Sequence, residues 1–338
     1  MSGFGSSTTS ESTSFNQRSV ESIIELVALN AALAASTQLA AHVKPGNIHR
    51  YHDFKETKME HYLSSAVALH TPMAEIAKRG VMVQRGLIDQ DEVDMGWIIA
   101  EAVKDGVKWH SGGLTNLGIL FLFAPVAAAS GYILSENAAD RIDTIDVKQI
   151  PKLAYKFVEN TTPEDTINIF STLYRVQSEI YPMSSAVGIS LPESINELLE
   201  EEVNLLDFYN LHKEKNLIFQ EISSFYEISS KAGLSAFNEA ITEGSSMVDA
   251  ITHTYISLLS LNPDSIILRN NGMEMAVRIM NMAKQVIQHG GYLSEEGREL
   301  TNELELFTRK HETTINPGVT ADLTANVTFF ATLSGIRP

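Results

Sequence analysis

The densest group of reactive side chains in this sequence lies in residues 44–54, which read Lys-Pro-Gly-Asn-Ile-His-Arg-Tyr-His-Asp-Phe. Two cations, two imidazoles, an amide and a carboxylate follow one another closely. Lys44 and Arg50 could hold phosphate oxygens, and Gly46 would let the backbone approach such a ligand. The carboxylate of Asp53 is the kind of hard oxygen ligand that Mg²⁺ prefers. The residues alone leave this interpretation and that of an ordinary polar loop with capped turns equally open.

Two further segments place polar side chains beside an expected helix start. Residues 110–118, His-Ser-Gly-Gly-Leu-Thr-Asn-Leu-Gly, precede an apolar stretch and resemble an anion site at a helix N-terminus. Taken alone, a flexible turn with a Thr or Asn cap explains them better, and the Lys-Ser/Thr pair of a P-loop is missing. Residues 262–272 contain Asp264 and Arg269, which suit a metal and a phosphate, or a helix cap and a surface ion pair.

A fourth segment, residues 316–323, reads Asn-Pro-Gly-Val-Thr-Ala-Asp-Leu. Its Pro-Gly pair predicts a turn, and Asp322 then falls in the first turn of the last helix, where the helix dipole favours a carboxylate. That placement is sufficient to explain the residue on its own. The sequence contains no His-Glu-x-x-His motif, EF-hand loop or dinucleotide-binding fingerprint, so the sites that those motifs define are not indicated.

The elements that must position these segments are predicted to be helices almost throughout. Apolar residues recur at helical spacing along most of the chain, and few stretches alternate as strands do. Pro72 predicts a break in the second helix and Gly80 its end, while residues 162–165, Thr-Pro-Glu-Asp, have the composition of a helix start. We expect helices near residues 20–42, 57–79, 91–104, 193–206, 208–231, 246–260, 272–289, 294–310 and 319–333.

Residues 111–135 carry no charged side chain and are long enough to span a bilayer. The segment contains Pro125 and Gly131, however, and its flanks show no strong cationic bias. A helix that is apolar all round is also what the centre of a large helical domain requires. We therefore predict an all-α protein, a single large helical domain with a buried apolar central helix, and no membrane partner.

Composition excludes several classes of protein. The chain has 338 residues, with 25 Lys and Arg against 42 Asp and Glu, and no cysteine. A net charge of −17 argues against a non-specific nucleic-acid binder. Without cysteine neither disulfides nor thiolate sites can form, and a reducing, cytoplasmic setting is expected. Residues 1–17 are rich in Ser and Thr, so we expect a disordered tail ahead of a domain over residues 18–338.

Taken together and in this order, the four segments resemble the triphosphoribosyl-dephospho-CoA synthase family, from residue 44 to residue 323. The Lys-Pro-Gly that begins at Lys44 resembles the opening motif of that family. His52-Asp53 resembles its His-x-Asp segment with a shortened spacer. The Leu-Thr-Asn-Leu-Gly of residues 114–118 is similar to its Asn-Thr-His-Lys-Gly motif.

The last two segments carry the resemblance further. Asp264 with Arg269 and Gly272 is similar to the family's Asp-Thr…Arg-x-Gly segment. The Asn-Pro-Gly-Val-Thr-Ala-Asp-Leu of residues 316–323 is similar to the family's Ser-Pro-Gly-Gly-Ser-Ala-Asp-Leu, which is the most specific motif of the set.

The resemblance implies a helical enzyme that uses ATP with Mg²⁺ and dephospho-CoA. Such an enzyme moves the triphosphoribosyl group of ATP to the ribose 2′-hydroxyl of dephospho-CoA and releases adenine. A triphosphate requires cations, and its Mg²⁺ requires carboxylates. Departure of adenine builds positive charge on the ribose, which a nearby carboxylate stabilises, and a histidine could move the proton.

On this basis we predict site residues in all four segments. The catalytic candidates are His49 and His52, as acid or base, and Asp322, at the ribose or at a second metal ion. Asp53 and Asp264 are the expected Mg²⁺ ligands. The predicted substrate-binding residues are Lys44, Gly46, Asn47, Arg50, Thr115, Asn116, Arg269, Gly318 and Thr320.

This chain departs from the family pattern at one place. Where the family motif has His-Lys, this sequence has Asn116-Leu117, which removes a base candidate and a cation. The acceptor could therefore be a related nucleotide rather than dephospho-CoA. Two alternatives stay open: a divergent ATP-dependent phosphoribosyl or triphosphoribosyl transferase with another acceptor, and a nucleotide-binding regulatory protein without turnover. A homodimer is also compatible with the sequence.

Overall fold

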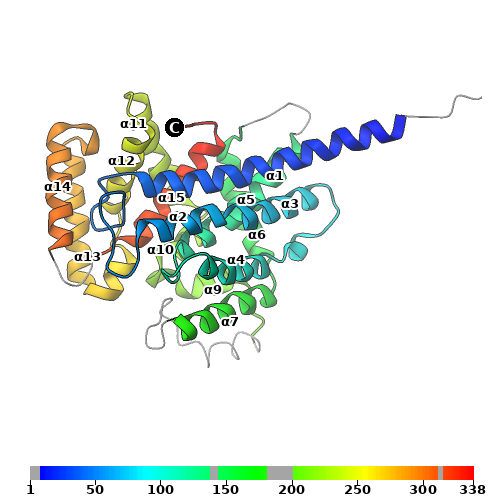
Figure 1. Ribbon diagram of the computed structural model, residues 1–338, viewed down its shortest axis with the longest axis horizontal. Helices are drawn as coiled ribbons and strands as arrows, with labels where there is room; N and C mark the ends of the chain where they lie inside the picture. The colour runs from blue at the N-terminus through cyan, green and yellow to red at the C-terminus, as the bar shows by residue number, and fades with distance from the viewer. Residues whose placement is uncertain (1–7, 138–143, 181–200, 311–314) are drawn as a thin grey trace, which may run out of the picture.

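The computed structural model describes residues 8–137, 144–180, 201–310 and 315–338 (Figure 1). Within these ranges the chain forms helices and no strand, apart from one isolated antiparallel bridge between His49 and His52. The prediction of an all-α protein is confirmed. Short 3₁₀ helices cover Gln90–Val93, Val147–Gln149, Lys213–Lys215 and Gly291–Leu293, and a π-helix covers Ile228–Gly233.

The α-helices follow one another along the chain with short connections. In order they are α1 (Thr8–Ala40), α2 (Met59–Ala68), α3 (His70–Gln84), α4 (Met95–Trp109), α5 (Leu117–Glu136), α6 (Ile150–Glu159), α7 (Pro163–Ile180), α9 (Leu205–His212), α10 (Leu217–Ser223), α11 (Leu234–Thr242), α12 (Met247–Leu259), α13 (Ser265–Gln288), α14 (Glu295–Arg309) and α15 (Gly318–Leu333).

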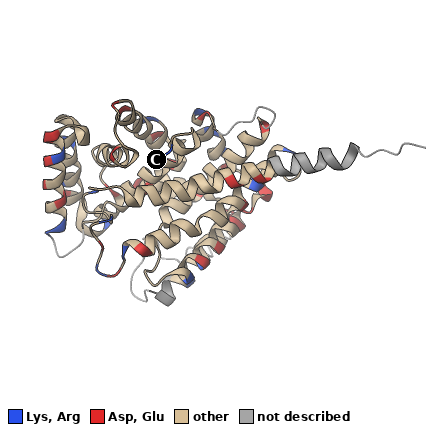
Figure 2. Cartoon of the chain, turned by 45° about the horizontal axis from the view of Figure 1, so that its top comes forward, with Lys and Arg blue, Asp and Glu red and all other residues tan. Residues whose placement is uncertain are grey.

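Helix α5 forms the centre of the molecule, as predicted. Val20–Ala40 and Leu117–Glu136 are both long and apolar enough to cross a membrane, but 89% of the most apolar stretch in α5 lies inside the protein. Helices α1, α3, α6 and α15 pack around it. Burial on all sides explains why this segment lacks charged residues between its ends. Figure 2 marks the positions of Lys, Arg, Asp and Glu along the cartoon, which are frequent on peripheral helices and few on the central ones.

Small residues set the close packing between α3 and α5. A Cβ on Gly80 would lie 2.0 Å from the backbone oxygen of Ala128, and one on Gly131 would lie 2.1 Å from that of Ala77. The prediction that Gly80 ends its helix is therefore wrong, because α3 continues to Gln84 and the glycine serves interhelical contact instead. The break predicted at Pro72 is confirmed, with α2 ending just before it.

Two other predicted helices have different boundaries. The helix expected over residues 208–231 is divided, because Asn216 caps a new helix by accepting from the Ile218 N–H, and Phe225 and Tyr226 take left-handed backbone angles. Helix α13 begins at Ser265, earlier than expected, and is interrupted at Gly272, whose φ of +83° is non-helical. The helix expected near residues 193–206 falls largely outside the described residues.

The N-terminal segment is drawn as helix from Thr8 onward. Helix α1 thus includes part of the segment expected to be a tail, and residues 1–7 lie outside the described residues. The division of the chain into a tail and a domain over 18–338 stays a prediction.

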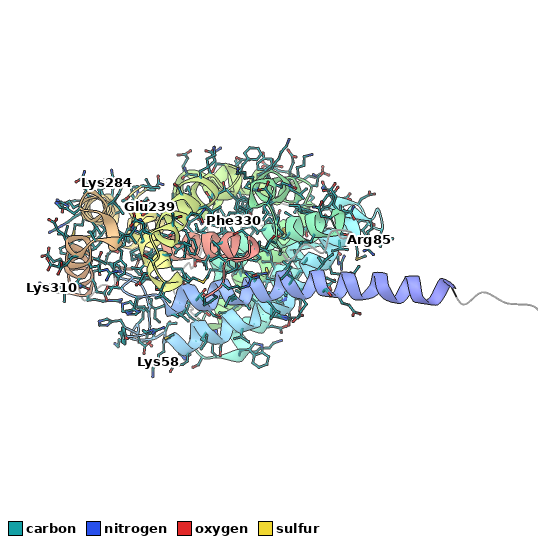
Figure 3. The ribbon with its side chains drawn as sticks, turned by 90° about the horizontal axis from the view of Figure 1, so that it is seen from above. Lys58, Arg85, Glu239, Lys284, Lys310 and Phe330 are labelled. Carbon is teal, nitrogen blue, oxygen red and sulfur yellow. The ribbon has the colours of Figure 1, made fainter. Side chains whose placement is uncertain are left out.

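Helix α15 runs through the interior, although it lies at the end of the chain. Fourteen of its residues are buried, among them Phe330, which Figure 3 places in the middle of the molecule. Lys58, Arg85, Lys284 and Lys310 lie at the periphery in the same view. The prediction that Asp322 falls in the first turn of this helix is wrong, because α15 begins at Gly318 and the carboxylate follows that turn. Asp322 is half-buried among these interior residues.

Candidate functional site

One cavity of about 340 Å³ brings the four predicted segments together. Each segment contributes to its wall, although the segments are far apart in the sequence. The contributing residues are Asn47 from the first, Asn116 and Gly118 from the second, Arg269 from the third, and Asn316, Gly318 and Asp322 from the fourth. Among the described residues of this wall, Asp322 is the one carboxylate and Arg269 the one Lys or Arg.

Several helices begin at this cavity. The first turns of α5, α13 and α15 contribute Leu117, Ile266 and Gly318 to its wall. The N-terminal end of a helix carries partial positive charge, so these helices direct positive potential into the cavity. The site is therefore suited to an anion even though only one cationic side chain lines it.

Asp322 is held against the start of α5. A Cβ on Gly118 would lie only 2.1 Å from Asp322 Oδ2 and 2.4 Å from Ile218 Cδ1. Only a glycine leaves room for the carboxylate at this position. Burial, together with the charge of Asp264, raises the pKa of Asp322 well above its ordinary value, while Lys44 acts in the opposite direction.

Lys44 does not line the cavity, but its charge interacts with that of Asp322. Its side chain is fully buried, and its Nζ has no hydrogen-bond partner among the described residues. Burial lowers the pKa of Lys44 to about 7, against the raising effect of Asp322. A buried ammonium group without a partner is costly, so this residue is poised to gain from a negative charge placed in the cavity.

Asp264 connects the third segment to the fourth. Its Oδ1 accepts from the backbone N–H of Ile266 at 2.8 Å and caps α13, as one of the two sequence interpretations required. Its Oδ2 accepts from the backbone N–H of Thr320 at 2.7 Å and from its hydroxyl at 2.8 Å. Burial raises the pKa of Asp264, and the hydrogen bonds from Thr320 oppose that rise. Both oxygens thus have protein donors.

The first segment is anchored by α14. Glu305 accepts from the Gly46 N–H at 2.9 Å, from His49 Nε2 at 3.2 Å and from Arg309 Nε at 2.8 Å. Arg309 in turn donates to the carbonyl oxygens of Gly46 and Asn47. Burial would raise the pKa of Glu305, but the hydrogen bonds from His49 and Arg309 bring it below its ordinary value.

His49 belongs to this anchor rather than to the cavity wall. Its side chain is 2% exposed, and its Nδ1 accepts from the Tyr51 N–H while Nε2 faces Glu305. Burial lowers the pKa of His49. The imidazole therefore has a protein partner at each nitrogen, and it holds the loop in place.

The first and fourth segments also touch directly. Gly46 has a φ of +77°, and a Cβ there would lie 2.2 Å from the Ile315 carbonyl oxygen. Asn47 Nδ2 donates to Asn316 Oδ1 at 2.8 Å, and both amides line the cavity. The Lys-Pro-Gly and Asn-Pro-Gly turns are thus packed against each other.

The second segment reaches the cavity through a small hydrogen-bond network. Thr115 Oγ1 lies 2.9 Å from His110 Nε2 and donates to Ser65 Oγ at 2.7 Å. Asn116 Nδ2 donates to the same Ser65 Oγ at 2.7 Å and to the Tyr62 carbonyl oxygen at 3.0 Å. With a φ of +56°, Asn116 occupies the cap position of α5. Thr115 is therefore a positioning residue beside the cavity.

Of the site residues predicted in the first segment, only Asn47 lines the cavity. Lys44, Gly46 and His49 are buried behind its wall, whereas Arg50, His52 and Asp53 are exposed. Arg50 Nε donates to the Ala40 carbonyl oxygen at 3.1 Å, and Asp53 Oδ1 accepts from the Met59 N–H at 2.8 Å. Because Asp264 also has donors on both oxygens, the predicted Mg²⁺ roles of the two aspartates stay predictions. The described part of the chain holds no group of three His, Asp or Glu that could bind a metal ion.

Other residues of the site are absent from the predicted set. Gln38, Tyr62 and Asn216 line the cavity but stand outside the four segments. Glu305 and Arg309 were overlooked because an acid and a base four residues apart are usual on a solvated helix face. Asn316 also lines the cavity and was not predicted. Because it lies within the fourth segment, its amide could have been identified as a candidate from the sequence.

Comparison with known proteins adds family information to this geometry. The family model for ATP:dephospho-CoA triphosphoribosyl transferase matches residues 24–337, nearly the whole chain. Proteins of two strains of Vibrio cholerae serotype O1, each assigned as a 2-(5″-triphosphoribosyl)-3′-dephosphocoenzyme-A synthase, are 30% identical over 93 residues. That match covers 27% of this chain and 29% of each relative's own length.

A solved structure shares the fold. The crystal structure assigned as a triphosphoribosyl-dephospho-CoA synthase from Archaeoglobus fulgidus superposes with a TM-score of 0.55 and 23% identity. The match covers 83% of this chain and 100% of that one. At this level of identity the likeness is one of fold.

Proposed function

The chain belongs to the ATP:dephospho-CoA triphosphoribosyl transferase family, and we propose that it transfers the triphosphoribosyl group of ATP to dephospho-CoA. In this reaction the bond between C1′ of the ATP ribose and N9 of adenine breaks. A new bond forms between that C1′ and the 2′-oxygen of the dephospho-CoA ribose. The hydroxyl proton of the acceptor leaves, and adenine departs with one proton, so that atoms and charge balance.

The observation that carries this proposal is the position of Asp322 in a cavity whose other features favour anions. A triphosphate placed against the starts of α5 and α15 and beside Arg269 would bring its ribose near the one carboxylate of the wall. Positive charge that develops at C1′ as adenine leaves would be stabilised by Asp322. The same carboxylate would accept the proton of the attacking hydroxyl.

Lys44, which does not line the cavity, would act on the triphosphate through its charge and not by contact. Its buried Nζ has no partner among the described residues, so an anionic ligand would favour its charged form. Asp264, Thr320, Glu305 and His49 would position the loops and touch no substrate. This division of roles keeps Asp322 and Arg269 as the groups in contact with substrate.

We propose that Mg²⁺ enters bound to ATP. The one carboxylate of the described cavity wall, Asp322, is needed at C1′, so the ion would take its ligands from the phosphate oxygens and from the waters that Mg²⁺ keeps at nucleotide sites. When bound, the ion would neutralise part of the triphosphate charge. ATP and dephospho-CoA are metabolites of the cytoplasm, so this activity would place the protein there.

Other nucleotides are tested as acceptors beside dephospho-CoA, because the uncharged Asn116 and Leu117 line the cavity where the family motif has His-Lys. Purified protein is incubated with ATP, Mg²⁺ and dephospho-CoA, and free adenine is measured by chromatography. Adenine that appears only with dephospho-CoA supports the proposal. Adenine that appears only with another nucleotide acceptor supports a divergent transferase. Saturable ATP binding without adenine in any mixture overturns the enzymatic proposal in favour of a regulatory protein.

A further inference from the structure

A second, larger cavity of about 1170 Å³ lies between α2, α3 and α4, next to the start of α5. Its walls carry Leu63 and Val67 from α2, Trp97 and Trp109 from α4, and Leu120 from α5. Residues 113–117 of the second segment line it as well. The cavity therefore adjoins the first site, and the proposed chemistry assigns no role to its apolar walls.

Large apolar side chains are unusually exposed around this cavity. Trp109 is 70% exposed, Val67 62%, Trp97 50% and Leu63 41%. A cluster of exposed apolar residues around a concave surface marks a binding site more often than a packing defect. The chain has two tryptophans, and both line this cavity.

The charges around the cavity do not favour a phosphate. Four carboxylates stand in its wall, from Glu60, Glu75, Glu101 and Asp105. Glu101 is paired with Lys104 at 2.6 Å and Asp105 with Lys108 at 2.7 Å. Arg79 is the one Lys or Arg among the described wall residues, and it is paired with Glu75 and Asp94, each at 3.0 Å. The described wall thus offers a phosphate no Lys or Arg that lacks a carboxylate partner, and an uncharged occupant fits it better.

The two cavities share a wall. Leu114, Asn116 and Leu117 line both. The first cavity is near the lower end of the range of about 300–1,000 Å³ in which a drug-sized ligand is bound, so it has room for one nucleotide. A reaction between two nucleotides needs further space, and the larger cavity is the adjoining one.

We propose that the larger cavity binds the uncharged pantetheine arm of the acceptor, while the nucleotide end of the acceptor faces the first cavity. This inference rests on the proposed function. The arm is an aliphatic chain with two amides and a terminal thiol, and it carries no charge at neutral pH. Its methyl and methylene groups match the apolar walls, and the diphosphate would meet Arg269 and the helix starts at the first cavity.

Intrinsic tryptophan fluorescence reports on this cavity directly, because the chain has no tryptophan elsewhere. Wild-type protein is titrated with pantetheine, with dephospho-CoA and with ADP, which is dephospho-CoA without the arm. Pantetheine and dephospho-CoA are expected to change the emission of Trp97 and Trp109 saturably, whereas ADP leaves it unchanged. Equal responses to ADP and dephospho-CoA, or no response to either arm-containing ligand, overturn the inference.

A matched pair of variants provides the second readout. Val67→Glu places a charge in the cavity, whereas Leu211→Glu places one at an exposed leucine on α9, away from both cavities. Val67→Glu is expected to raise the KM for dephospho-CoA at least tenfold and to leave turnover with ADP as acceptor unchanged. Leu211→Glu should match wild type in both. Equal loss with both acceptors in Val67→Glu overturns the inference.

The two proposals fail separately. Saturable fluorescence responses without any adenine release keep the arm site and reject the proposed transfer. Adenine release without a fluorescence response keeps the transfer and rejects the arm site. A blue shift that depends on protein concentration alone, together with dimers in sedimentation, assigns the tryptophan face to a second copy of the chain and overturns the inference.

Discussion

The α-carbon of Gly118 faces the carboxylate of Asp322 so closely that a Cβ added to the glycine would lie 2.1 Å from Oδ2. This contact joins the start of α5, the buried central helix, to the N-terminal part of α15. It fixes the carboxylate at the wall of the smaller cavity, where we propose that the reacting ribose binds. The predictions below follow from this contact and its neighbours.

Gly118→Ala should displace Asp322 and lower kcat at least tenfold, because even a methyl group cannot share the space of the carboxylate. Leu211→Ala in α9 is the matched control, since this side chain is exposed and lies outside both cavities. The control should keep the kcat and the melting temperature of wild type, because truncation of an exposed side chain removes few contacts. Steady-state kinetics and thermal unfolding measure both effects. Full activity in Gly118→Ala would contradict the contact.

Asp322→Asn should lower kcat about 100-fold or more, in line with the loss of a group that stabilises transition-state charge. It should also change the pH dependence of stability. Because the pKa of Asp322 is raised in the folded protein, the unfolded chain releases this proton at lower pH. Wild type therefore loses stability as pH rises above about 4, whereas the variant does not.

The measurement compares the melting temperature of Asp322→Asn with that of wild type between pH 4 and pH 6.5, without ligands. The difference in favour of the variant should grow with pH. A difference that is constant or reversed over this range would show that the carboxyl group is not destabilised by burial.

Lys44 should take up a proton when ATP binds. Its pKa of about 7 leaves it mostly neutral at pH 8, and a triphosphate nearby favours the charged form. Calorimetry of Mg-ATP binding at pH 8, in buffers of different ionisation enthalpy, should report uptake of close to one proton. Lys44→Met should abolish the uptake, and Lys284→Met, at an exposed position of α13, should not. Identical proton uptake in Lys44→Met and wild type would remove Lys44 from the site.

Asp264→Asn separates a positioning role from a metal role. The substitution turns one oxygen acceptor into a donor that faces the donors of Thr320, so stability should fall by about 1–3 kcal/mol in chemical denaturation. The Mg²⁺ concentration that supports half-maximal activity should stay unchanged. A tenfold higher Mg²⁺ requirement with wild-type stability would instead identify Asp264 as a metal ligand.

The helical class and the buried central helix were predictable, because both follow from the spacing and composition of residues that are close together in the sequence. An unbroken apolar run such as residues 117–135 leaves few alternatives to a central helix in a protein of this size. Gly80 shows the limit of this reasoning. A glycine after a helical pattern suggests an end, and only the approach of Ala128 from α5 reveals that it serves packing.

The sequence predicts which segments form the site, but it is a poorer guide to which of their side chains line the cavity. The four segments meet at one cavity, but Arg50, His52 and Asp53 lie on its outside, because the loop turns at the bridge between His49 and His52. Glu305 could not be found from the sequence. Its role arises from the approach of α14 to the Gly46 backbone, a contact between residues far apart in the chain.

Mass spectrometry of dephospho-CoA after incubation with Mg-ATP tests the central claim most directly, with wild type and Asp322→Asn run side by side. The account predicts that wild type adds one intact triphosphoribosyl group and releases one adenine for each acceptor consumed, and that the variant does so at least 100-fold more slowly. Unmodified dephospho-CoA with wild type, or equal rates for the two proteins, would contradict it.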